Sequence, residues 1–95
     1  MPDSAAAKKP VQSISLATPE GREKAFRHAL ALHEKGRKAE AAQIYRALVT
    51  VAPSHAASWI NLGTVLRGEG KYLAAAGCAA RAVALDPDNP AYLTN

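Results

Sequence analysis

Apolar and polar side chains alternate with the period of an α-helix in the second half of the chain. Apolar or small residues recur at three- and four-residue steps, which places them on one helix face. These residues are Trp59, Leu62, Gly63 and Leu66. Gly68 and Gly70 follow, and either glycine can adopt the left-handed conformation that ends a helix. The pattern therefore predicts a helix over residues 55–67.

A partner helix is predicted over residues 72–85. Its inner face is expected to consist of Tyr72, Ala75, Ala79 and Ala82. Pro87 ends this helix, because proline cannot continue a helix and restricts the residue before it. Asn89 and Pro90 then have the pattern of a new helix start.

The first half of the chain predicts two further helices, over residues 19–35 and 38–51. Thr18 is a suitable cap for the first of them, and Gly36 ends it. The buried stripe of the second is expected to be Ala41, Ile44, Tyr45 and Leu48. Ser54 is expected to cap the helix that follows.

The chain repeats itself when the sequence is shifted so that Gly36 falls on Gly70. The same shift matches Ala41 with Ala75, Pro53 with Pro87, Leu32 with Leu66, and Ala29 with Gly63. Glycine and proline match where the chain changes direction, and small residues match where helices must approach closely. The chain therefore contains two copies of one helix–turn–helix unit.

This pattern resembles the tetratricopeptide repeat family, whose 34-residue signature runs Trp-x2-Leu-Gly-x2-Tyr, then Ala-x3-Phe, then Pro. The second copy matches at Trp59, Leu62, Gly63, Ala75 and Pro87, and the first at Ala41, Tyr45 and Pro53. The departures are Leu66 for tyrosine and Ala79 for phenylalanine in the second copy, and Ala25, His28 and Ala29 for tryptophan, leucine and glycine in the first.

The resemblance implies an all-α fold of antiparallel helix–turn–helix repeats, an α-solenoid with about two full repeats and the start of a third. Residues 1–17 are then a flexible tail, residues 18–55 and 56–89 are the repeats, and residues 90–95 begin a truncated third repeat or form a capping stub. Three repeats are the usual minimum for stability. We therefore expect a fragment of a longer protein, a truncated product, or a chain that covers its last helix by self-association.

The tail has an alternative. Residues 5–7 are too short for the apolar region of a signal peptide, and Lys8 follows at once. A flexible leader is the simpler interpretation. The other is that Ile14 and Leu16 dock on the first helix pair.

The residue types that usually build catalytic, metal or cofactor sites form no such motif in this sequence. Cys78 is the single cysteine, which excludes a disulfide framework, and a small apolar residue at a helix contact is its expected role. His28 and His33 are five residues apart, a poor spacing for a shared metal ion, and no HExxH motif is present. His28 is expected to be a half-buried packing residue. We predict a protein that is not an enzyme and needs no cofactor.

In repeats of this family the first helix of each pair lines a concave groove. Side chains left over from core packing point into it. By helical spacing these are Glu23, Phe26, Arg27, Leu30 and His33 in the first copy, and Ala57, Ile60, Asn61, Thr64 and Arg67 in the second. The mixture suits an extended peptide or a helix. The alternative is that Phe26, Leu30 and Ile60 pack against the neighbouring unit or the tail.

Asn61 is the groove residue of greatest interest, because an amide can both donate to and accept from a peptide backbone. The repeat places Asn61 at the same position as Arg27 and Asn95. An asparagine ladder at this position resembles the superhelices of the O-linked N-acetylglucosamine transferase family, where it holds the backbone of the substrate protein. The carboxylate clamp, another binding mode of the family, is disfavoured because Phe26 and Leu30 occupy its lysine and asparagine positions.

The net charge of +4 is concentrated in residues 20–55. This part has seven basic residues (Arg22, Lys24, Arg27, Lys35, Arg37, Lys38, Arg46) against four acidic ones (Glu20, Glu23, Glu34, Glu40). The excess favours an acidic partner or RNA. No aromatic residues are interleaved with the basic ones, so nucleic acid is the less favoured partner. No apolar run approaches the roughly 20 residues that would cross a membrane.

These observations predict a non-catalytic protein–protein interaction module of the cytoplasm that binds a peptide or partner protein in its groove. The alternative is the substrate-recruiting N-terminal region of a larger enzyme, such as a glycosyltransferase. Self-association through the uncapped last helix is a further expectation.

Overall fold

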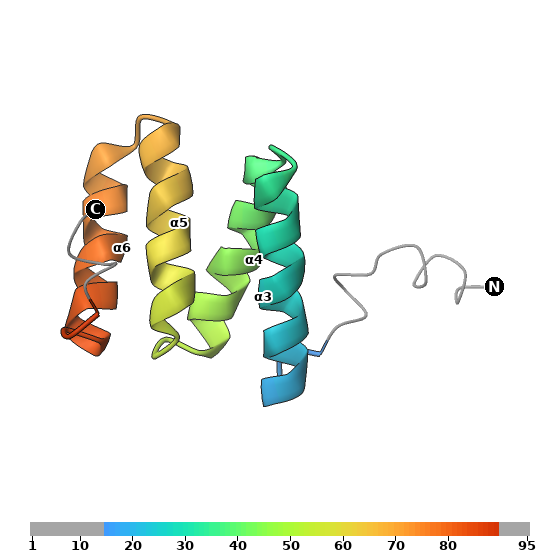
Figure 1. The fold of residues 1–95 in the computed structure, drawn as a ribbon. Helices are drawn as coiled ribbons and strands as arrows, with labels where there is room; N and C mark the ends of the chain where they lie inside the picture. The colour runs from blue at the N-terminus through green and yellow to red at the C-terminus, as the bar shows by residue number, and fades with distance from the viewer. Residues whose placement is uncertain (1–14, 90–95) are drawn as a thin grey trace.

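The computed structural model describes residues 15–89, and this part of the chain forms four α-helices and no strand (Figure 1). The helices are α3 (Pro19–Glu34), α4 (Lys38–Val51), α5 (Ala56–Gly68) and α6 (Tyr72–Leu85). They alternate in direction, and each packs mainly on the next in sequence. The all-α prediction is confirmed, and every helix end falls within one residue of its predicted place. The predicted start of a third unit and residues 1–14 lie outside the described residues.

The turns within the two units have the same geometry. Gly36 and Gly70 both have a φ of 82°, in the left-handed region that glycine adopts without a steric cost. The amide of Arg37 donates to the carbonyl of Leu32 at 2.9 Å, and the amide of Lys71 donates to the carbonyl of Leu66 at the same distance. This is a glycine-based helix end in both copies. Gly68, the other candidate, lies inside α5.

Helix starts are capped by two different side chains. The Thr18 hydroxyl accepts a hydrogen bond from the amide of Gly21 at 3.0 Å, as predicted. The prediction for α5 is wrong: Nδ1 of His55, not Ser54, accepts from the amide of Ser58, at 3.3 Å. The Ser58 hydroxyl lies 2.6 Å from the same nitrogen, and must donate to it because Nδ1 is already an acceptor. Since α5 begins at Ala56, the capping position falls on His55.

The core runs along all four helices and consists mostly of short aliphatic side chains. Its buried members include Ala25, Ala29, Leu32, Ala41, Ala42, Ile44, Tyr45, Leu48, Leu62, Val65, Leu66, Ala75, Cys78 and Ala82. Tyr45 is the large exception. Cys78 occupies the helix contact expected for it, next to Gly63 on α5.

Two aromatic residues of the second unit lie outside its fully buried core. Trp59 is half-buried at the edge of the core, where its indole nitrogen donates to the carbonyl of Pro53 at 2.8 Å. The Arg81 guanidinium carbon lies 4.9 Å from the centre of the Trp59 ring. Tyr72, predicted on the inner face of α6, is 68% exposed instead. Tyr72 is the first residue of α6, and although its spacing matches the helix period, the contact with α5 buries Ala75 and Ala82 of this face but not Tyr72.

The end of the predicted tail that the structure describes contacts the helices. Leu16 is partly buried against the core, and its carbonyl accepts a hydrogen bond from Arg22 at 2.9 Å. The docking alternative is therefore the correct one for Leu16. Ile14 lies outside the described residues.

We expect Gly63→Ala to destabilise the protein even though alanine is the better helix former. A Cβ at this position would lie 3.1 Å from the carbonyl oxygen of Ala75 and 3.2 Å from the Cβ of Cys78, so the two helices would have to separate. Overpacking of this kind costs about 1–3 kcal/mol. Thermal unfolding followed by circular dichroism measures the effect.

Gly77→Ala is the matched control, because a Cβ on Gly77 in α6 meets nothing within 4 Å. It should stabilise the chain by up to about 1 kcal/mol through helix propensity alone. Equal stabilisation by both substitutions would contradict the close packing of α5 on α6.

Candidate functional site

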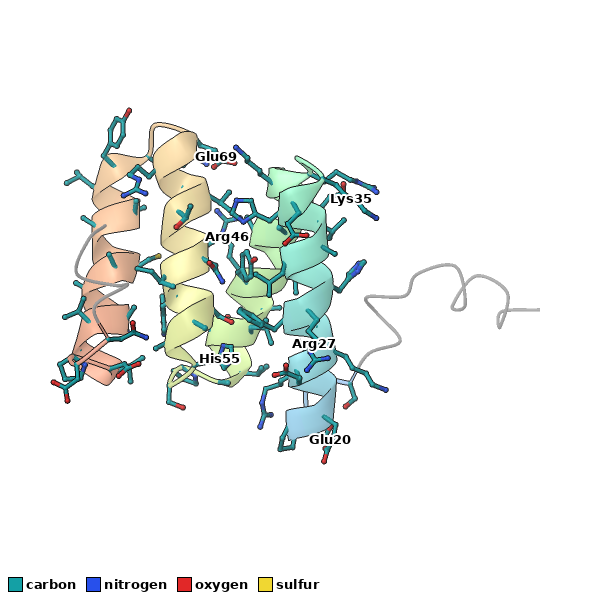
Figure 2. All side chains as sticks on the ribbon, in the orientation of Figure 1. Glu20, Arg27, Lys35, Arg46, His55 and Glu69 are labelled. Atoms are coloured by element: carbon teal, nitrogen blue, oxygen red, sulfur yellow. The ribbon has the colours of Figure 1, made fainter. Side chains whose placement is uncertain are left out.

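The predicted groove residues lie on α3 and α5, the first helices of the two units. Figure 2 shows Arg27 on α3 and His55 at the end of α5 that follows α4. The structure distributes these candidates over several environments. Phe26 belongs to an aromatic cluster, Arg27 lies at an exposed depression, and three residues of α5 line a pocket against α6.

Phe26 is used for packing between the two units. Its ring lies 6.0 Å from that of Tyr45, tilted by 58°, and 5.1 Å from the His55 ring in an edge-on arrangement. These are favourable geometries for aromatic pairs. Phe26 thus connects α3 to α4 and to the start of α5, which confirms the packing alternative for this residue. Leu30 and His33, further along α3, are half-buried.

Tyr45, which packs against Phe26 in this cluster, has a hydroxyl without a hydrogen-bond partner among the described residues. Its side chain is fully buried, with 0% of the residue exposed. The oxygen meets no donor or acceptor in that part of the chain. Burial raises the pKa of Tyr45 to about 12, because the phenolate would lose its hydration. The phenol is therefore a packing group that carries an unsatisfied polar atom.

Arg27 is exposed and forms an ion pair with Glu23 at 2.9 Å, one helical turn earlier. Both residues border an open depression on α3 together with Pro19, Glu20 and Lys24. In the same half of the chain, Arg37 pairs with Glu40 through two hydrogen bonds. Part of the basic charge that the sequence places here is therefore balanced locally.

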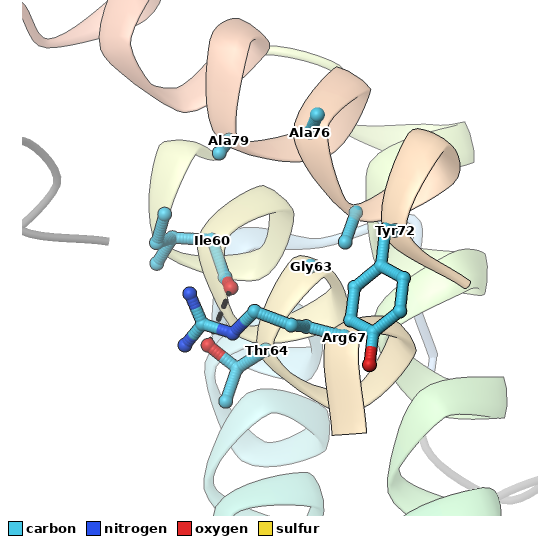
Figure 3. A pocket seen from close by; sticks show the side chains of 8 residues that line it. Ile60, Gly63, Thr64, Arg67, Tyr72, Ala76 and Ala79 are labelled. Atoms are coloured by element: carbon cyan, nitrogen blue, oxygen red, sulfur yellow. Dashed lines mark hydrogen bonds between the residues drawn. The ribbon is translucent and has the colours of Figure 1, made fainter. Parts of the chain in front are cut away.

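On α5, the side chains of Ile60, Thr64 and Arg67 line a pocket of about 130 Å³ (Figure 3). The opposite wall is α6, which contributes Tyr72, Ala75, Ala76 and Ala79, with Gly63 at the base. The Thr64 hydroxyl donates to the carbonyl of Ile60 at 3.0 Å, so its polar group is satisfied by its own helix. The pocket therefore presents a mostly apolar surface.

Asn61 lies beside this pocket on α5 and is half-buried. Within residues 15–89 its side-chain amide makes no hydrogen bond. It is therefore a directed polar group with its donors and acceptor unused.

The α6 wall of the pocket is not among the site residues predicted from the sequence. Tyr72 and Ala79 were expected in the core of α6, and Ala76 had no predicted role. The internal repeat contains the signal that identifies them. Ala79 occupies the repeat position of Tyr45, so the side chain that fills the junction of the two units is missing from α6.

The two helix–turn–helix units therefore share one turn geometry, and alanine and glycine stand at their helix contacts. A family model described as "Tetratricopeptide repeat" matches residues 4–56 and residues 26–90.

The chain belongs to the tetratricopeptide repeat family.

This confirms the resemblance on which the fold was predicted, and proteins with tetratricopeptide repeats commonly act as protein–protein interaction modules. No curated protein matches the chain. In the described part of the tetratricopeptide units, no group of three or more His, Cys, Asp or Glu side chains is arranged to hold a metal ion. Across residues 15–89, no helix has the length and apolar character needed to cross a membrane.

Tyr45→Phe should stabilise the protein by about 1 kcal/mol, because it removes a buried hydroxyl that has lost its hydration without gaining a partner. Chemical denaturation at neutral pH tests this. Tyr72→Phe, which removes an exposed hydroxyl, is the control and should leave stability unchanged.

The same substitution should change the response to alkaline pH. Below pH 10 the Tyr45 phenol is protonated in both the folded and the unfolded chain, so it adds no pH dependence. Between pH 10 and about 12 the unfolded chain releases this proton while the folded chain retains it, so stability falls as the pH rises. Tyr45→Phe should lose less stability over this interval, and parallel curves for both proteins would contradict the burial of the phenol.

Proposed function

We propose that the chain is a non-catalytic interaction module that binds an extended peptide of a partner protein along α3 and α5. The observation that carries this proposal is Asn61. It is half-buried, its amide is unbonded within the described residues, and it lies next to the half-buried Thr64 on the helix surface, with Ile60 on the far side of Thr64. An amide in this position can bracket a peptide group, while the aliphatic parts of its neighbours exclude water.

The α3 part of the surface supports the same mode. Leu30 and His33 are half-buried and follow each other along the helix at three-residue spacing. Together with Ile60 they provide apolar contact area with occasional polar groups, as peptide grooves do. Phe26 holds α3 against α4 and the start of α5 through its contacts with Tyr45 and His55.

A peptide fits this surface better than RNA does. Phe26 is half-buried and already packs against two other rings, so less of its surface is available to stack on a nucleobase. Arg27 and Arg37 are already paired with glutamates, which reduces the charge available to phosphates.

The second candidate is the substrate-recruiting region of a larger enzyme such as a glycosyltransferase. Asn61 favours this second candidate, because the residue stands at the repeat position where the O-linked N-acetylglucosamine transferase family has its asparagine ladder. The two candidates share the same binding chemistry, and the coding sequence downstream of Asn95 distinguishes them.

Peptides selected from a randomised display library against the 95-residue chain provide the test. We expect Asn61→Ala to weaken the selected peptides about tenfold or more, because a directed hydrogen-bonding amide is lost. The melting temperature should remain near that of the wild type, since the amide makes no hydrogen bond within the described residues. Isothermal titration calorimetry measures the affinity.

Gln43→Ala is the matched control, because it removes an exposed amide from α4, away from the proposed groove. It should leave both affinity and stability unchanged. Equal affinities for wild type and Asn61→Ala, or a loss with Gln43→Ala, would reject the groove as the binding surface.

A further inference from the structure

The segment that leads into α3 folds back on the helix that it precedes. Leu16 and Ala17 form a turn, and the amide of Ala17 donates to the Ser15 hydroxyl at 3.2 Å. The Leu16 side chain packs against the core, and the Leu16 carbonyl accepts a hydrogen bond from the Arg22 guanidinium at 2.9 Å. We call residues 15–17 the clip. Among the described residues, one apolar side chain and one side-chain hydrogen bond hold the clip on α3.

Gly21 provides the surface on which the clip rests. Gly21 is buried in the second turn of α3. A Cβ built on Gly21 would overlap the carbonyl oxygen of Ser15 and would also lie too close to its carbonyl carbon. These are backbone atoms, which cannot turn aside as the end of a flexible side chain can. Glycine therefore allows the backbone of the clip to approach α3 closely.

The clip stands before α3 where the end of α4 stands before α5. The internal repeat places residues 15–17 at the positions of residues 49–51, which form the last turn of α4. In that turn Val49 is buried in the core, and α4 packs on α5. In the clip it is Leu16 that packs against the core. The clip therefore covers the start of the first unit with far fewer residues than a helix would.

We propose that the clip is a detachable cap that closes the first unit at the start of α3, with Gly21 as the residue on which docking depends. When the clip is docked, Leu16 covers an edge of the core. When it is released, this apolar edge is open. Segments with few buried apolar contacts open at a lower free energy than the core beneath them, so the clip opens while α3 remains folded.

The clip is separate from the surface proposed to bind a peptide. Gly21 shares one helix face with Ala25 and Leu32, and all three are buried. Leu30 and His33 of the proposed groove lie on a different face of α3. Release of the clip therefore leaves the groove intact, and a failure of this proposal would not affect the proposed peptide binding.

The test is limited digestion of the 95-residue chain with chymotrypsin, which cleaves after leucine and aromatic residues, with the products quantified by mass spectrometry. Cleavage between Leu16 and Ala17 requires the clip to leave α3. When opening is fast relative to cleavage, the rate follows the open population. Gly21→Ala should raise this rate about tenfold or more, because the clip cannot dock over a Cβ. Arg22→Ala, which removes the hydrogen bond to the Leu16 carbonyl, should raise it by a smaller factor.

Two controls separate release of the clip from unfolding. Gly77→Ala adds a methyl group to α6 that meets nothing within 4 Å, and it should leave cleavage after Leu16 unchanged. Cleavage after the fully buried Tyr45 reports opening of the core and should stay slow in every variant. Equal rates after Leu16 in the wild type and Gly21→Ala would overturn the proposal. A parallel rise after Tyr45 would overturn it too, because the substitution would then have unfolded the first unit instead of releasing the clip.

Discussion

The close approach of helices within each unit is the constraint on which the rest of the structure depends. α5 and α6 are so near at Gly63 that even a methyl group would contact the backbone of Ala75. Short side chains make this approach possible, but they bury little apolar area per residue, and apolar area is the main source of stability. Each helix pair therefore needs its neighbour. At the junction of the two units the missing volume is supplied by Tyr45 and Phe26, and the second unit has no equivalent of Tyr45.

Local signals were sufficient to predict the helices. Gly36 and Gly70 end their helices in the same way because only the residues of one turn determine that geometry. The cap of α5 was harder to predict, since Ser54 and His55 are both capable acceptors and the choice depends on where the loop allows the helix to begin. Tyr72 shows a different limit. The helical period predicts which residues share a face, but not how far along the helix that face is covered: Ala75 and Ala82 are buried, whereas Tyr72 at the start of α6 is exposed.

The candidate site could be predicted only in part. The period places Phe26 and Asn61 on the first helices of their units, and the groove assignment treats both as available to a ligand. The structure separates them, because Phe26 meets the rings of Tyr45 and His55, which are distant from it in sequence. No spacing rule encodes such a contact. Asn61 has no ring or partner of this kind among the described residues, so its amide is a polar group of the surface that remains unbonded there.

The packing of each helix on the next in sequence also affects how the chain folds. Contacts between consecutive helices require only short loops to close, and proteins dominated by such contacts fold within microseconds to milliseconds. Within residues 15–89, α6 packs mainly on α5 and many of its side chains are exposed, whereas the junction around Tyr45 is fully buried. The amides of α6 should therefore exchange with solvent before those of the junction.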